Sequence, residues 1–179
     1  MRPLRCFLAV AVAALWGASA LAQSSPPQSG AASMSSPVPT VAGWIETATF
    51  PEQGITLDAK LDTGAVSSSL SVTDLERFKR KGKTWYRFTM QGIDGKTATV
   101  EQQTSRIARV TRAEVKDTRR PIVRLKLCVA GHEAVTDVTL TDRSSQDYLL
   151  LIGRKFLASR VLVDSSRKHL FADPCKGGK

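Results

Sequence analysis

The residues best suited to chemistry in this 179-residue chain lie in the stretch "AKLDTGAVSSSL", positions 59–70. Apolar and polar residues alternate from Ile55 to Leu61, which is the pattern of a half-buried strand. Asp62 follows on the face opposite Leu61, and Gly64 lets the backbone turn tightly just after it. The sequence therefore predicts a carboxylate that a rigid strand delivers into a turn, where a reacting group is held still.

A single carboxylate in a turn supports two interpretations. An Asp that starts a tight turn is common in all-β proteins and need have no chemical role. Peptide hydrolysis without a metal or a covalent nucleophile requires activation of water and protonation of the leaving amine, and two carboxylates that share one proton can do both. Asp-Thr-Gly occurs once in the sequence, because Asp58, Asp94, Asp142 and Asp164 lack a following Thr-Gly. A catalytic pair would therefore need a second chain.

Short apolar–polar patterns dominate the rest of the chain and predict an all-β fold with one short helix, arranged as a closed or orthogonal β-barrel. We expect a helical turn or loop at 72–84, a hairpin of strands 84–91 and 97–103 around Asp94-Gly95, and an ambiguous, extended segment at 107–115. Strands are expected at 120–129, 134–142 and 148–153, a helical turn at 154–159, and a closing hairpin of 160–166 with 168–173.

The sequence also predicts how the chain is divided into a leader, a linker, a folded domain and a tail. Residues 1–22 have two arginines, an apolar run and Ala20-Leu21-Ala22, which indicates a secretory signal peptide; an uncleaved anchor is the alternative. Residues 23–41 are rich in Ser and Pro and predict a flexible linker, followed by one domain at 42–175 and a tail at 176–179. We therefore expect export, with a periplasmic location and no membrane span after cleavage.

The two cysteines beyond the signal peptide are Cys128 and Cys175. An oxidising compartment favours a disulfide between them. Cys128 lies in an apolar run, so a buried core thiol is the alternative.

Positive charge is concentrated in the chain. The net charge is +10, and loss of Arg2 and Arg5 with the signal peptide would leave +8. Eight basic residues fall between Thr104 and Lys126 against two acidic ones. Such a surface can simply be a solvated face, or it can meet an acidic partner or substrate. No nucleic-acid-binding motif is present, so nucleic acid is not expected as a partner.

Two segments together resemble a known family. "LDTGA" at 61–65 is similar to the active-site signature of retropepsin-like aspartic proteases, and "LLLIGRKFL" at 149–157 is similar to their second signature. The series "AKLDTGA", "RPIVRL", "LTDRS" and "LIGRKFL" more narrowly resembles the bacterial family labelled ATP-dependent zinc proteases. The resemblance covers residues 44–172 and implies a retropepsin-like barrel with one lobe per chain. It implies a homodimeric aspartic endopeptidase that acts on a peptide or protein substrate.

The resemblance also implies roles for single residues. Asp62 would be catalytic, Thr63 would hydrogen-bond across the dimer, Gly64 would lie near the catalytic water and Ala65 would leave room for substrate. The second signature would support the Asp62 loop from below through Ile152 and Gly153, and Arg154 would pair with an acid. Val66 stands where retroviral enzymes carry an acidic residue, which puts their mode of peptide-backbone recognition in question here.

The position of the flap in retropepsins implies that residues 105–120 form it, with Arg109, Arg112 and Arg119 near substrate. The hairpin at 85–102 is the competing candidate, since it has the stronger turn signal. No cofactor or metal is expected, because the chain has no ATP-binding loop and no His-Glu-x-x-His motif. The alternative function is a non-enzymatic periplasmic binding module on the same fold.

Overall fold

The computed structural model describes residues 38–112 and 115–176, and within them the chain forms ten strands and one short helix. The elements in chain order are β1 (Thr40–Phe50), β2 (Ile55–Leu61), β3 (Ser68–Ser71), β4 (Thr73–Arg80), β5 (Lys83–Gln91), β6 (Thr97–Arg112), β7 (Val115–Val129), β8 (His132–Thr141), β9 (Leu150–Ile152), α1 (Arg154–Leu157) and β10 (Val161–Lys168).

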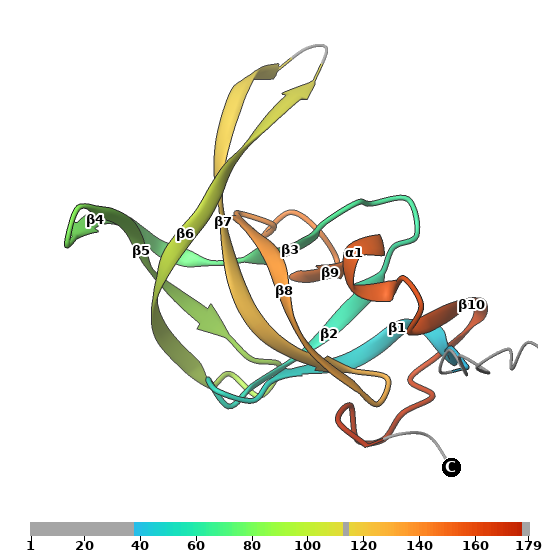
Figure 1. Ribbon diagram of the computed structural model, residues 1–179. Coiled ribbons are helices and arrows are strands. Elements are labelled where there is room, and N and C mark those ends of the chain that lie inside the picture. Colours follow the sequence, from blue (N-terminus) through green and yellow to red (C-terminus); the bar gives the residue numbers. More distant parts are fainter. Residues whose placement is uncertain (1–37, 113–114, 177–179) are drawn as a thin grey trace, which may run out of the picture. The chain divides into compact units, whose positions relative to one another are not determined.

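Six of these strands close into a barrel. The hydrogen-bonded order runs β1–β2–β9–β3–β8–β7, and β7 returns to β1 through the pairs Ala48 with Val129 and Thr49 with Cys128. β10 adds to β1, and β6, β5 and β4 extend the sheet beyond β7 (Figure 1). The prediction of an all-β, retropepsin-like barrel with one short helix is confirmed.

The barrel core follows from the alternation read in the sequence. In β2, Ile55, Leu57, Ala59 and Leu61 are buried, while Thr56 and Asp58 are partly exposed and Lys60 is exposed. The same period brings Leu150 and Ile152 of β9 into the core and leaves Leu151 between them half-buried. Burial of one face therefore fixes which side chains point out of the barrel.

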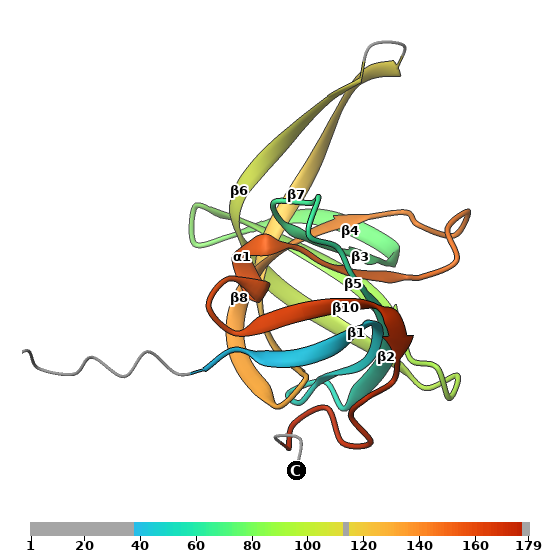
Figure 2. The ribbon, with the colours of Figure 1, turned by 90° about the vertical axis from the view of Figure 1, so that its right-hand side faces the viewer.

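β6 and β7 form a long hairpin, of which only the lower part joins the rest of the sheet. β5 pairs with β6 from Thr97 to Gln103, and β8 pairs with β7 from Ile122 onward. Beyond these points the two strands pair with each other, from Arg106 with Ile122 to Arg112 with Val115. Both views show this outer part extending away from the other strands (Figures 1 and 2).

Two sequence-based expectations are wrong. The segment expected to be a helical turn or loop is strand β4, which pairs antiparallel with β5 although nearly all of its side chains are exposed. The expected closing hairpin does not form, because β10 pairs in parallel with β1. The residues after β10 are held instead by Glu46, whose buried carboxylate accepts hydrogen bonds from the backbone N–H groups of Leu170 (3.0 Å) and Phe171 (3.3 Å).

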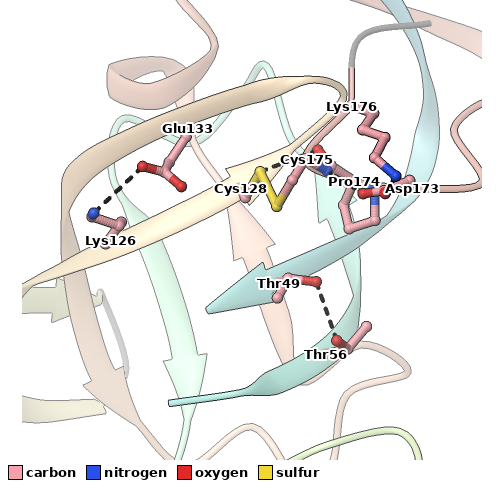
Figure 3. Close-up of a disulfide and its surroundings, with 9 residues drawn as sticks. All are labelled: Thr49, Thr56, Lys126, Cys128, Glu133, Asp173, Pro174, Cys175 and Lys176. Carbon is pink, nitrogen blue, oxygen red and sulfur yellow. Dashed lines mark hydrogen bonds and ion pairs between the residues drawn. A yellow bond between two sulfur atoms is a disulfide. The ribbon is translucent and has the colours of Figure 1, made fainter. Parts of the chain in front are cut away.

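The C-terminal segment is also tied to β7. The structure joins Cys128 and Cys175 by a disulfide, with their Cα atoms 5.3 Å apart (Figure 3). Cys128 is fully buried in the core, and in the structure it is disulfide-bonded, not the free thiol of the alternative interpretation. The disulfide anchors the segment that follows Phe171 beside the end of β7.

The predicted signal peptide and nearly all of the predicted linker lie outside the described residues. The linker prediction also included Thr40 and Val41, which are the first residues of β1. Within 38–112 and 115–176, no helix has the length and apolar character needed to cross a membrane.

Candidate active site

Asp62 lies directly after β2, in a turn built on its own carboxylate. Oδ1 accepts hydrogen bonds from the backbone N–H groups of Gly64 (2.8 Å) and Ala65 (3.2 Å). The backbone N–H of Asp62 donates to the carbonyl oxygen of Ile152 (2.9 Å), so the turn is also attached to β9. Among the described residues both hydrogen bonds go to Oδ1, which leaves Oδ2 of a partly exposed carboxylate available for chemistry.

The short helix α1 braces this turn. Nη1 of Arg154 donates to the carbonyl oxygens of Thr63 (2.9 Å) and Gly64 (2.8 Å), and its backbone N–H donates to the carbonyl oxygen of Ala65 (2.9 Å). The expectation that Arg154 pairs with an acid is therefore corrected for the described part of this chain. The guanidinium instead donates hydrogen bonds to two backbone carbonyl oxygens. These hydrogen bonds fix the backbone path of the turn that carries Asp62.

Gly153 lets the two signature segments approach closely. A Cβ atom at this position would lie 2.6 Å from the carbonyl carbon of Ser67, closer than carbon atoms come without movement of the backbone. The N–H of Gly153 donates to Oγ of Ser68 (3.2 Å) in β3. The structure thus brings Ile152, Gly153 and Arg154 together with Asp62, Thr63, Gly64 and Ala65, as the resemblance implied for a supporting loop.

Arg143 is a residue of this region that sequence reasoning missed. Its Nη1 donates to Oγ of Ser69 (3.1 Å) and its Nε to the carbonyl oxygen of Tyr148 (3.1 Å). Burial lowers the pKa of the Arg143 guanidinium, the positive charge of Arg120 lowers it further, and the negative charge of Asp62 opposes both. The available signal was the "LTDRS" segment, which contains Arg143. The segment served only as part of the family resemblance, and no role was predicted for Arg143 itself.

The arginines proposed for a flap lie on the outer part of the β6–β7 hairpin. Arg109 pairs with Arg119 across the two strands, and Arg112 pairs with Val115. The flap candidate 105–120 falls on the β6–β7 hairpin, and the competing candidate 85–102 falls on the β5–β6 hairpin, so both candidates are pairs of antiparallel strands. The orientation of these three side chains lies outside what the structure describes.

The described residues do not fit the zinc in the family label. No three His, Cys, Asp or Glu side chains in ranges 38–112 and 115–176 are grouped closely enough to share a metal ion. His132 begins β8 with Nε2 3.0 Å from Oγ1 of Thr40, and His169 follows β10. These two residues belong to different parts of the fold and make no common site.

Comparison with solved structures finds a crystal structure of a protein of unknown function from Legionella pneumophila, with a TM-score of 0.61 and 30% sequence identity. The match covers 73% of this chain and 96% of the Legionella chain. Two polypeptides of such identity that align over nearly the whole of one share the same fold and the same order of elements.

Curated relatives carry a different name. They include proteins named probable alpha-L-glutamate ligase from Shewanella halifaxensis, 28% identical over 132 residues, and from Parasynechococcus marenigrum, 27% identical over 139 residues. The matches cover 70% and 74% of this chain but only 28% and 29% of those relatives. The chain therefore spans less than a third of their length, and their name describes proteins with much more sequence.

A family profile matches most of the folded part. The family is described as RimB-like, retropepsin-like aspartic endopeptidase RimB, and the match extends over residues 41–174. This range contains both signature segments, the complete barrel and the turn that presents Asp62. The chain belongs to the RimB-like family of retropepsin-like aspartic endopeptidases.

Proposed function

We propose that this protein is an exported, homodimeric aspartic endopeptidase in which two Asp62 carboxylates activate water. The observation that carries the proposal is the Asp62 turn. Its carboxylate is partly exposed, its backbone is attached to β9, and Arg154 fixes the two carbonyl groups that follow. Such support holds a reacting group in one position without covering it.

The catalytic step needs a second carboxylate. Two aspartates that face one another cannot both ionise easily, so one stays protonated while the other is charged. The charged carboxylate takes a proton from water as the water attacks the peptide carbonyl carbon. The protonated carboxylate donates its proton toward the carbonyl oxygen, and a proton then passes to the amine as the C–N bond breaks.

A second copy of the chain is the natural source of that carboxylate. Thr63 and Gly64 are exposed beside Asp62, and so is Val66 (54%). Next to Thr63 lies a hollow of about 240 Å³ with an apolar lining that includes Pro39, Leu157 and Leu162. Leu162 is 56% exposed in the single chain. A two-fold contact would cover these side chains and bring the two Asp62 turns together.

An acidic peptide is the substrate class that the charge favours. Arg109, Arg112 and Arg119 lie on the β6–β7 hairpin, and in the proposed enzyme this hairpin would act as the flap. The curated relatives are named as ligases of glutamate, so peptides of glutamate are the first acidic substrates to test. Export is supported by the leader-like residues 1–22 and by the disulfide, since disulfides persist in oxidising compartments.

The test is hydrolysis of glutamate-rich peptides by the mature protein and by Asp62→Asn. The amide is nearly isosteric with the carboxylate but cannot share a proton, so cleavage should fall by about 10³-fold or more. A chelator and ATP should leave the wild-type rate unchanged. Full activity of Asp62→Asn, or loss of activity with a chelator alone, would contradict the proposal. Peptide binding without any hydrolysis would favour the alternative of a binding module.

The dimer is tested at the same time by sedimentation. Leu162→Asp should shift the protein toward monomer and lower activity in proportion, because the charge would enter an apolar contact. Val135→Asp is the matched control, since Val135 is similarly exposed (50%) but lies on β8. Cleavage by a protein that sediments only as monomer would show that one chain suffices.

A further inference from the structure

The β4–β5 hairpin ends in a strongly basic tip that the proposed function does not use. The basic tip, residues 77–83, reads RFKRKGK and contains five basic residues and no acidic residue. Lys81 and Gly82 form its turn with φ angles of +50° and +74°, as in a tight two-residue hairpin turn. In the described pairings β6 follows β5 only as far as Trp85, so the hairpin beyond that residue is a projecting two-stranded ribbon (Figure 1).

Most of the positive charge on the basic tip is not neutralised. Arg80 forms an ion pair with Glu101, and Arg87, nearer the barrel, forms ion pairs with Glu101 and Glu76. The four other basic residues of the tip are exposed and have no acidic partner within the described part of the chain; they are Arg77, Lys79, Lys81 and Lys83. Four exposed cations in so short a segment attract an anionic surface, and this attraction weakens as salt is added.

Two aromatic rings lie beside these charges. Phe78 and Trp85 are partners across the two strands, with ring centroids 6.4 Å apart. The guanidinium carbon of Arg80 lies 4.7 Å from the ring centroid of Trp85 and 5.2 Å from that of Phe78. Both rings are half-buried, so part of each remains in contact with solvent. Tryptophan and phenylalanine next to basic residues are the composition that favours the interface between lipid headgroups and water.

A hollow of about 470 Å³ lies on the other face of the ribbon. Its lining includes Arg77 and Lys83 of the basic tip, together with Thr84 and Tyr86, and no carboxylate contributes to it. Guanidinium, ammonium and hydroxyl groups are the donors from which phosphate oxygens accept hydrogen bonds. A phosphate headgroup could therefore be received on this face while the aromatic rings contact the headgroup region on the other.

We propose that the basic tip binds the surface of an anionic phospholipid bilayer, with Lys81 nearest the bilayer and Trp85 at the level of the headgroups. Nucleic acid is the other polyanion that such a charge could meet. Single strands are bound in grooves whose aromatic rings offer a free face to the bases, whereas the tip is a narrow projection and Arg80 already lies over the ring of Trp85. Binding to a bilayer needs no hydrolysis, so this inference goes beyond the proposed function and holds or fails independently of it.

The experiment measures co-sedimentation of the mature protein with two kinds of vesicle: phosphatidylcholine alone, and an equal mixture of phosphatidylcholine and phosphatidylglycerol. We expect binding to the mixed vesicles only, weakening as salt is added. Lys79→Gln together with Lys81→Gln should weaken this binding by about 10- to 30-fold, because one basic residue near an anionic bilayer contributes about fivefold. Lys96→Gln together with Arg124→Gln is the matched control, since it removes the same charge from two exposed positions outside the basic tip.

The fluorescence of Trp85 locates the contact. Trp16 lies in the leader, so Trp44→Phe leaves Trp85 as the one tryptophan of the mature protein, and its emission should move to shorter wavelength with the mixed vesicles. Absence of binding to the mixed vesicles, or binding without a change in this emission, would overturn the proposal. Equal weakening by the tip variant and its control would show that total charge, and not the basic tip, attracts the bilayer. Tighter binding to a short DNA duplex than to the mixed vesicles, lost in the same tip variant, would assign the tip to nucleic acid instead.

Discussion

The turn that carries Asp62 and the outer part of the β6–β7 hairpin are supported in opposite ways. The turn is attached to β9 through Ile152, to α1 through Arg154 and, through the segment that follows, to Gly153. The hairpin beyond Arg106 consists of two strands that pair with each other, without a third strand on either side in the described pairings. Two-stranded ribbons are marginally stable by themselves, whereas a turn fixed from several elements is not free to move.

The comparison separates two tasks of a protease. Under the proposed function, catalysis needs a carboxylate held in one place, and the hydrogen bonds of the Asp62 turn would hold it there. Closure over a substrate needs a segment that can change position at little cost, and in the described pairings the outer part of the hairpin has no third strand to separate from. Changes in the turn should therefore alter the rate of the chemical step, and changes in the hairpin should alter substrate capture.

The largest effect should come from the turn's main brace. Arg154→Ala removes the donors to the carbonyl oxygens of Thr63 and Gly64, and displacement of a catalytic group by about 1 Å costs about 100-fold in rate. We expect kcat to fall by about that factor with a smaller change in KM, measured with a glutamate-rich peptide. Arg160→Ala is the control at the other end of the same helix, because Arg160 follows α1 and donates to the carbonyl oxygen of Phe156. Equal losses in both variants would remove the special role of Arg154.

Gly153→Ala tests the close approach of the two signature segments. The added Cβ would meet the backbone of Ser67, so we expect a loss of about 1–3 kcal/mol in the free energy of unfolding by urea. Gly82→Asn is the contrast, since Gly82 has a φ of +74° with no atom near its would-be Cβ. Asn tolerates this conformation, and about 1 kcal/mol or less should be lost. A Gly153→Ala protein as stable as wild type would show that the two segments can separate at no cost.

The hairpin should respond more weakly and through salt-dependent capture. Arg109→Gln together with Arg112→Gln should raise KM for glutamate peptides about two- to fivefold per charge at low salt and leave kcat near its wild-type value. At physiological ionic strength the Debye length is about 8 Å, so the difference should shrink as salt is added. Lys79→Gln together with Lys81→Gln removes the same charge from the β4–β5 hairpin. If that pair raises KM as much, overall charge and not the β6–β7 hairpin captures the peptide.

The smallest effect should be at Asp164, which belongs to neither region. Hydrogen bonds from Ser166 and then from Arg167 lower the pKa of Asp164 to about 2. The folded state therefore holds this proton less tightly than the unfolded state does, and the stabilisation is present above the ordinary aspartate pKa. It is lost as the pH falls toward 2. The stability difference between wild type and Asp164→Asn in urea should be constant near neutral pH and should shrink in acid, with cleavage unchanged. A difference that grew in acid would reverse the assignment.

The sequence predicted the parts of the fold that burial controls. β2 was readable because one of its faces lies in the core, and that reading placed Asp62 on the outer side. β4 was not, since its side chains are nearly all exposed. It is held by backbone pairing with β5 and by cross-strand contacts such as Phe78 with Trp85 and Arg87 with Glu76. A polar surface strand carries no hydrophobic period to detect.

Long-range pairing explains the other differences. The parallel contact of β10 with β1 joins residues more than a hundred positions apart, whereas the sequence analysis paired the neighbouring segments 160–166 and 168–173 as a hairpin. Arg143 was missed for the same reason. Its hydrogen-bond partner Ser69 is 74 positions away, and only the folded barrel brings the two residues together.

The disulfide between Cys128 and Cys175 makes a covalent ring of the C-terminal third of the fold. β8, β9, α1 and β10 all lie within it, and so does the exposed segment from Ser144 to Asp147. A protease that cuts this segment would leave two fragments still joined, with Arg154 on one and β7 on the other. The nicked protein should migrate as one band on a gel without reductant and as two bands with it.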